Sequence, residues 1–296
     1  MYTLIKKAGY KVLRNVEQIP FVQAQAEQAY QAALKKHVAN LPILSTSDKS
    51  LLETIKREGV AITSLESLGI TSTPRFFQAA KNLMQEIPKS IYAQKNEFVV
   101  HATSQQIMEY PEIFLWGLEQ RLLNIVENYV GLPVAYHGAY FRRDIANKIE
   151  RKSRLWHMDK EDRKVLKIIV YLNNIGDDGG PFQYIPQSLT STAASFLKYN
   201  YEYIQEKTME RVIPPSHWKS CTGSSGTVVF ATTSSIFHRG KIPLTSDRFA
   251  VFFDYTSRQP QHRFYCKSSL PQQDLLLMAK KLSEPQKNCV FWQQHS

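Results

Sequence analysis

The hydrophobic pattern of the chain changes period at Pro133. Beyond this point, apolar residues gather in short runs rich in Val, Ile, Phe and Tyr, which are typical of β-strands. The predicted strands are residues 134–141, 155–158, 165–172, 181–185, 227–231 and 248–255. Glycine-rich turns at 176–180 and 223–226 separate some of them. Many short strands divided by turns favour a β-sandwich or barrel over alternating βαβ units.

The part before Pro133 is predicted to be mainly helical. Apolar residues recur at helical spacing over 21–38 and 111–130, with shorter helices expected over 49–57 and 73–86. Ser47 and Asp48 are candidate N-caps for the helix expected over 49–57. Residues 188–209 are expected to form a partly helical insertion between strands, and 275–282 a last helix. We therefore expect one domain over 1–296, with a helical part to 133, a β core over 134–267 and a C-terminal tail.

Composition limits the classes of function. The 296 residues are 43% hydrophobic, which supports a sizeable core, yet no apolar run reaches the length of a membrane span. The net charge of +11 comes from scattered lysines and arginines, so an anionic substrate is a more natural expectation than nucleic acid. The three cysteines are widely spaced and predict reduced thiols rather than disulfides. No signal-peptide pattern is recognised, and a cytoplasmic location is expected, with the oligomeric state open.

Four side chains suggest a metal site with a bound ketoacid. His157 and Asp159 are two residues apart, so a strand would present both on one face. His238 follows the strand 227–231, and Arg248 opens the next strand ten positions later. Two histidines and a carboxylate form the facial triad of non-haem iron(II) oxygenases, which leaves three coordination positions open. A 2-oxoglutarate molecule can take two of these and O2 the third, while a guanidinium suits the far carboxylate.

This combination resembles the phytanoyl-CoA dioxygenase branch of the iron(II)/2-oxoglutarate oxygenases. The matching features are His157-x-Asp159, His238 and Arg248, together with the segments 166–174 and 179–188 between them. The resemblance covers about two-fifths of the chain, from Val134 to Tyr255. It implies a double-stranded β-helix, or jelly roll, flanked by helices. It also implies that the triad binds iron, that Arg248 holds 2-oxoglutarate, and that ketoacid decarboxylation is coupled to C–H hydroxylation.

The chain also departs from the family pattern. Many relatives place a serine two residues after the distal histidine to assist the arginine, and Gly240 stands there instead. Lys167, the one charge in an apolar strand, and Tyr140 are candidates to replace that support. Halogenating relatives lack the carboxylate ligand, so Asp159 favours hydroxylation, desaturation or ring formation over halogenation.

Other polar and aromatic residues receive weaker roles. Arg142 shares a strand face with Tyr140 and is a candidate for an anionic substrate group, although an exposed arginine is an equal alternative. Trp156 is expected in the core, and the remaining histidines are expected to serve packing or the surface. The aromatic stretch 196–203 is either a lid over the substrate or a packed helix.

The sequence therefore predicts an iron(II)/2-oxoglutarate dioxygenase that oxidises a small organic substrate, in secondary or lipid metabolism. Two rivals stay open. One is a jelly-roll binding or regulatory protein without turnover, which Gly240 favours and the intact triad opposes. The other is an enzyme that uses the same ligands for a metal without 2-oxoglutarate, which Arg248 opposes.

Overall fold

The computed structural model describes residues 20–87 and 97–295. The chain forms two compact units, Met1–Pro42 and Ile43–Ser296. In the first, helix α2 (Pro20–His37) continues into a 3-10 turn at Val38–Asn40. The helix was expected to be amphipathic, but none of its residues is buried. Pro88, which is expected to end the helix predicted over 73–86, lies outside the described residues, as does the N-terminal segment.

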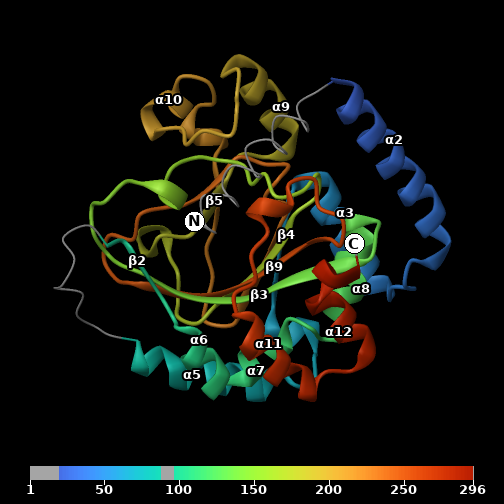
Figure 1. Ribbon diagram of the computed structural model, residues 1–296. Helices are drawn as coiled ribbons and strands as arrows, with labels where there is room; N and C mark the ends of the chain where they lie inside the picture. Colours follow the sequence, from blue (N-terminus) through green and yellow to red (C-terminus); the bar gives the residue numbers. More distant parts are fainter. Residues whose placement is uncertain (1–19, 88–96, 296) are drawn as a thin grey trace, which may run out of the picture. The chain divides into compact units, whose positions relative to one another are not determined.

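Two antiparallel sheets form the centre of the second unit (Figure 1). The large sheet has the strand order β1-β7-β4-β9-β3-β2, and the small sheet has the order β6-β5-β8. The large sheet consists of β1 (Val60–Ser64), β2 (Val99–His101), β3 (Val134–Asp144), β4 (Leu166–Tyr171), β7 (Thr227–Ala231) and β9 (Arg248–Ser257). The small sheet consists of β5 (Phe182–Tyr184), β6 (Lys219–Cys221) and β8 (His238–Gly240).

The path of the chain between the sheets identifies the fold as a double-stranded β-helix. From β3 onward the chain passes to the small sheet at residue 157, back to β4, to β5 and β6, to β7, to β8 and finally to β9. This winding of two facing sheets is the jelly roll, as expected. The predicted strand 155–158 is wrong as a continuous strand, because only isolated bridges form there, from Trp156 to Ile204 and from His157 to His238.

Helices cover the outer faces of both sheets (Figure 1). Helices α5, α7, α8 and α12 lie on the large sheet, while α9 and α10 lie by the small one. The helices of this unit are α3 (Thr46–Glu58), α4 (Leu65–Leu68), α5 (Thr73–Glu86), α6 (Ser104–Glu109), α7 (Pro111–Trp116), α8 (Gln120–Val130), α9 (Gln187–Phe196), α10 (Glu206–Glu210), α11 (Gln272–Met278) and α12 (Glu284–Val290).

The single helix expected over 111–130 is two helices, α7 and α8, broken at Gly117. Two tyrosine hydroxyls from the large sheet donate hydrogen bonds to backbone carbonyls that would otherwise accept from the next helical turn. Tyr136 donates to the Phe114 carbonyl at 2.9 Å, and Tyr255 donates to the Gly117 carbonyl at 2.7 Å. The Tyr136 ring also packs against the bare Cα of Gly117, where a side chain would collide with it. The break therefore comes from packing on the sheet rather than from local propensity.

Smaller differences concern helix caps and short strands. Helix α3 begins one turn earlier than expected, because the Ser45 hydroxyl accepts a hydrogen bond from the Asp48 amide. Strands β1, β2, β6 and β8 were not predicted. Three of them have only three residues, which is too short to show an alternating pattern.

The space between the sheets is filled by side chains from both. Ile169, Val229 and Ala250 of the large sheet pack against Phe182 and Cys221 of the small one.

The three cysteines are free thiols, as expected, and all are buried. In the described part of the chain, no helix is long and apolar enough to cross a membrane.

Candidate metal centre

The two predicted histidine ligands are neighbours across the small sheet. His157 and His238 exchange both backbone hydrogen bonds, with N···O distances of 3.1 and 2.9 Å. Their imidazole rings lie 4.3 Å apart between centroids. A pairing of this kind places both side chains on the same face. The fold therefore brings together two residues that are 81 positions apart in the sequence.

Each histidine is oriented by a backbone carbonyl. Nδ1 of His157 lies 2.8 Å from the Leu155 carbonyl, and Nδ1 of His238 lies 3.2 Å from the Ile236 carbonyl. A carbonyl only accepts, so Nδ1 carries the proton and Nε2 keeps a free lone pair. Burial lowers the pKa of His157, and burial with the neighbouring His157 lowers the pKa of His238 to about 3. Both rings are thus neutral near pH 7, which is the form that binds metals.

Asp159 completes the group. One ligand atom from each of His157, Asp159 and His238 lies within 4.8 Å of the others, and all three are at least partly buried. Asp159 Oδ1 is 3.8 Å from His157 Nε2, and its Oδ2 is 3.9 Å from His238 Nε2. Burial raises the pKa of Asp159, but the Lys167 ammonium and the two histidines outweigh it and hold that pKa well below its ordinary value. The carboxylate is therefore ionised.

Lys167 contacts this carboxylate directly. Its ammonium on β4 lies 2.8 Å from Asp159 Oδ2 and 3.7 Å from Asp254 Oδ2. The ammonium thus forms an ion pair with the carboxylate, whose two oxygens each face one of the histidines. Lys167 was expected near the ketoacid, and the structure places it against the metal ligand instead.

These three residues fit an octahedral cation such as iron(II). Ligand atoms at about 2.1 Å from one ion and at right angles stand about 3 Å apart, so the group, now within 4.8 Å, would contract by up to about 2 Å on binding. Two neutral imidazoles and one carboxylate are the donor set of the facial triad, which leaves one side of the ion open. The chemistry of the donors and their spacing therefore both suit the predicted metal.

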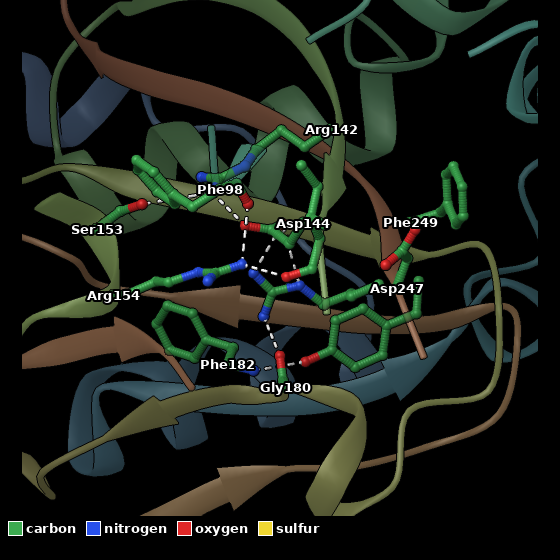
Figure 2. Close-up of polar contacts among 12 residues, drawn as sticks. Phe98, Arg142, Asp144, Ser153, Arg154, Gly180, Phe182, Asp247 and Phe249 are labelled. Carbon is green, nitrogen blue, oxygen red and sulfur yellow. Dashed lines mark hydrogen bonds and ion pairs between the residues drawn. The ribbon is translucent and has the colours of Figure 1, made fainter. Parts of the chain in front are cut away.

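Arg248 is buried and paired with an aspartate that sequence reasoning missed. Its side chain is 2% exposed, and its Nη2 lies 2.9 Å from Oδ2 of Asp144, which is 1% exposed. The other Asp144 oxygen is 2.7 Å from Arg142 Nη2. Nη1 of Arg248 donates to the Gly180 carbonyl. Figure 2 shows Asp144 between Arg142 and the contact at Gly180.

This cluster carries a net positive charge. Burial raises the pKa of Asp144, but Arg142 and Arg248 together lower it to about 2. One carboxylate thus faces two guanidiniums. A guanidinium has five N–H donors, and Asp144 and Gly180 use three of those on Arg248. The remaining N–H groups are suited to a second carboxylate.

Gly240 connects this cluster to the metal ligands. It lies two residues beyond His238 on β8, about 7 Å along the strand and on the same face. A Cβ atom at Gly240 would stand 2.8 Å from Arg248 Nη2. The guanidinium therefore occupies the space that a serine side chain would need. The Arg248 guanidinium therefore lies beside the strand that carries His238, two residues along from it.

The other predicted residues lie elsewhere. Tyr140 is on the same face of β3 as Arg142, as expected, but its hydroxyl donates to the Lys267 carbonyl at 2.8 Å, away from Arg248. Arg142 pairs with Asp144 and lies over the Phe252 ring at 4.8 Å, so it is not the exposed arginine that was the alternative. Trp156 is fully buried, as expected.

The insertion between β5 and β6 reaches the metal ligands. Helix α9 ends at Phe196, so the following aromatic stretch is not a continuous packed helix. The Tyr199 hydroxyl accepts a hydrogen bond from the Met158 amide at 2.9 Å. The Tyr203 ring is 52% exposed and lies 5.1 Å from the His157 ring. Both contacts favour the first of the two alternatives, a lid, over a packed helix.

Asp144 and Asp254 were not singled out from the sequence, although a signal existed for each. Asp144 is two residues after Arg142, and Asp254 is six residues after Arg248, so each shares a strand face with a candidate residue. The strand register supplies the remaining information, because it places Asp144 opposite Arg248 and Asp254 opposite Lys167.

No family model matches the chain, and no curated protein is significantly similar to it. Solved structures resemble it weakly. HygX from Streptomyces hygroscopicus, with nickel and 2-oxoglutarate bound, is 15% identical, covering 73% of this chain and 88% of its own, with a TM-score of 0.49. The non-haem α-ketoglutarate-dependent carbocyclase SnoK of nogalamycin biosynthesis is 15% identical, covering 81% and 91%, with a TM-score of 0.48. EctD from S. alaskensis is 18% identical, covering 73% and 78%, with a TM-score of 0.47. Likenesses at this level decide nothing about chemistry.

Proposed function

We propose that the chain is an iron(II)- and 2-oxoglutarate-dependent oxygenase that oxidises a C–H bond of a small organic substrate. The observation that carries this proposal is the relation of two sites in the jelly roll. His157, Asp159 and His238 offer three metal ligands within 4.8 Å of one another. Arg248 lies buried beyond His238 with N–H groups available, beside Gly240. A ketoacid that chelates the metal would reach it.

In this proposal each residue has a defined task. The two neutral imidazoles and the Asp159 carboxylate hold iron(II) from one side, and Lys167 keeps the carboxylate ionised and oriented. Arg248 binds the far carboxylate of 2-oxoglutarate, while Asp144 fixes the direction of the guanidinium. When bound, iron and the ketoacid supply the oxidising power, with decarboxylation of 2-oxoglutarate to succinate and CO2. Asp159 occupies the position that a halide would need, which disfavours halogenation, and hydroxylation is the default outcome among hydroxylation, desaturation and ring formation.

The test is ketoacid turnover. The iron-loaded protein is expected to convert 2-oxoglutarate to succinate in air, and Asp159→Ala is expected to abolish this conversion. Asp177→Ala, which removes an exposed carboxylate from a turn 18 positions after Asp159, is the matched control. Under anaerobic conditions, addition of 2-oxoglutarate is expected to produce a metal-to-ligand charge-transfer band in the visible spectrum.

The same measurements separate the rival functions. A jelly-roll binding protein without turnover would form the charge-transfer band but would produce no succinate with any substrate. An enzyme that uses the metal without 2-oxoglutarate would show neither the band nor an effect of Arg248→Met on metal-dependent activity. Absence of the band in protein that holds one equivalent of iron overturns the proposal.

A further inference from the structure

A cavity of about 330 Å³ is lined by residues of β3, β4, β9 and the segment 265–269. Lys167 lines this cavity and contacts Asp159 at 2.8 Å. Asp254, on β9, lies six residues beyond Arg248, about 20 Å along the same face of the strand. The cavity is therefore at the opposite end of the barrel interior from the Arg248 cluster, where the ketoacid is proposed. The lining includes the polar residues His137, Tyr140, Glu161, Lys167, Asp254 and Ser269, together with apolar surface.

Three of the lining residues carry a buried polar atom that no described residue satisfies. These atoms are Nδ1 of His137, Oδ1 of Asp254 and Oγ of Ser269. A buried polar group without a partner is costly, and native structures contain few of them. The three residues line one cavity, so a molecule bound there would complete their hydrogen bonds once the side chains turn these atoms toward it.

The hydrogen-bonding role of His137 follows from its neighbours. The Thr256 hydroxyl donates its one proton to the Ser257 carbonyl at 2.9 Å, so its oxygen can only accept from His137 Nε2, at 2.8 Å. Nε2 therefore carries the proton, and Nδ1 is an acceptor. Burial and the nearby Lys167 lower the pKa of His137 to about 3, which keeps the ring neutral. His137 is 4% exposed.

The unsatisfied groups are thus mainly acceptors. His137 Nδ1 and Asp254 Oδ1 both need a donor, and the Ser269 hydroxyl can act either way. The Lys167 ammonium lies 3.7 Å from the other Asp254 oxygen, so it leaves Oδ1 open. Tyr140, whose proton goes to the Lys267 carbonyl, adds a further acceptor oxygen to the lining.

We propose that this cavity binds the primary substrate, and that the substrate is a small polar molecule that presents hydrogen-bond donors, amine or hydroxyl, to Asp254 and His137. The inference rests on the proposed function for the identity of the site as a substrate pocket. It differs from the anionic substrate that the basic composition suggested, because the guanidinium chosen for that role, Arg142, is already paired with Asp144.

The test is a binding experiment that needs no turnover. The full chain is loaded with zinc(II) and saturated with 2-oxoglutarate, and probes built on one five-carbon skeleton are compared by saturation-transfer NMR. The probes are 5-aminopentan-1-ol, pentane-1,5-diol and pentanoic acid. Asp254→Asn removes the charge at constant shape. His137→Gln keeps a donor to Thr256 but lacks the acceptor at the Nδ1 position. Glu66→Gln, in a separate hollow of about 480 Å³, is the matched control.

We expect the amino alcohol and the diol to bind and the acid not to bind. Each of the two cavity variants is expected to weaken binding about tenfold, which corresponds to the loss of one hydrogen bond to a buried group. Asp254→Asn is expected to affect the amino alcohol more than the diol, which tells the two kinds of donor apart, and Glu66→Gln is expected to bind as the wild type does. Circular dichroism checks that each variant is folded.

The inference is overturned if the acid binds best, if no probe binds, or if folded Asp254→Asn and His137→Gln variants bind like the wild type. Its failure is distinguishable from failure of the proposed function. Succinate production that depends on Asp159 can stand while no probe binds, and donor-dependent binding to the cavity can stand while no succinate forms.

Discussion

Asp144 on β3 lies directly opposite Arg248 on β9, and the two side chains form an ion pair of 2.9 Å that is almost completely buried. The pair holds the guanidinium that the proposed ketoacid would use. Because Arg142 contacts the other oxygen of the same carboxylate, Asp144 is the counter-charge of two guanidiniums, one buried and one half-buried.

Asp144→Ala is expected to lower the free energy of unfolding by about 3 kcal/mol or more, since it leaves a buried guanidinium without its counter-charge. Urea denaturation measures the loss, and Asp177→Ala, on an exposed turn, serves as the control. A loss below about 1 kcal/mol, the range of a surface ion pair, would contradict the importance of this contact.

Gly240→Ser introduces the residue expected from the resemblance to phytanoyl-CoA dioxygenases, yet it is expected to harm the protein. Its Cβ would stand 2.8 Å from Arg248 Nη2, so the guanidinium must move. We expect a stability loss of about 1–3 kcal/mol from overpacking, together with a raised KM for 2-oxoglutarate. The control is Gly176→Ser, because a Cβ there meets no atom within 4 Å. A lower KM in Gly240→Ser would show that the serine assists the arginine here too.

Lys167→Met is expected to make metal binding more sensitive to acid. Lys167 is the main group that lowers the pKa of Asp159 against the effect of burial. Without the ammonium that pKa rises, so protons compete better with the metal as the pH falls. Cobalt(II) titrations between about pH 5 and pH 8 should show the variant losing affinity at a higher pH than the wild type. Identical profiles would mean that the ammonium does not tune this carboxylate.

His137 predicts a loss of stability on acidification. Its pKa is about 3 in the folded chain, and 6.5 is the ordinary value. Between these values the unfolded state binds one more proton, so the free energy of unfolding falls as the pH drops through this window, by up to about 1.4 kcal/mol per pH unit. His137→Gln should flatten the curve, whereas His217→Gln, at an exposed position, should not. An unchanged slope in His137→Gln would contradict a neutral buried imidazole.

The grouping of His157, Asp159 and His238 was predictable, because residue type and spacing in the sequence already point to it. His157 and Asp159 stand two apart, and His238 and Arg248 flank strands whose apolar pattern is plain. What the sequence does not reveal is which strands face one another. Register alone brings Asp144 opposite Arg248 and Asp254 opposite Lys167, and this is why Lys167 was assigned to the ketoacid rather than to Asp159. The break at Gly117 is hidden for the same reason, since tyrosines from distant strands cause it.

The backbone pairing of His157 with His238 has a consequence for how the barrel closes. These residues form an isolated bridge rather than part of a continuous ladder, so few backbone hydrogen bonds hold that side of the small sheet. A metal ion bound by the side chains of His157 and His238 would cross-link two residues that are 81 positions apart. Assembly of the small sheet and capture of the metal are then one cooperative event, and hydrogen exchange at the amides of His157 and His238 would slow when metal is added.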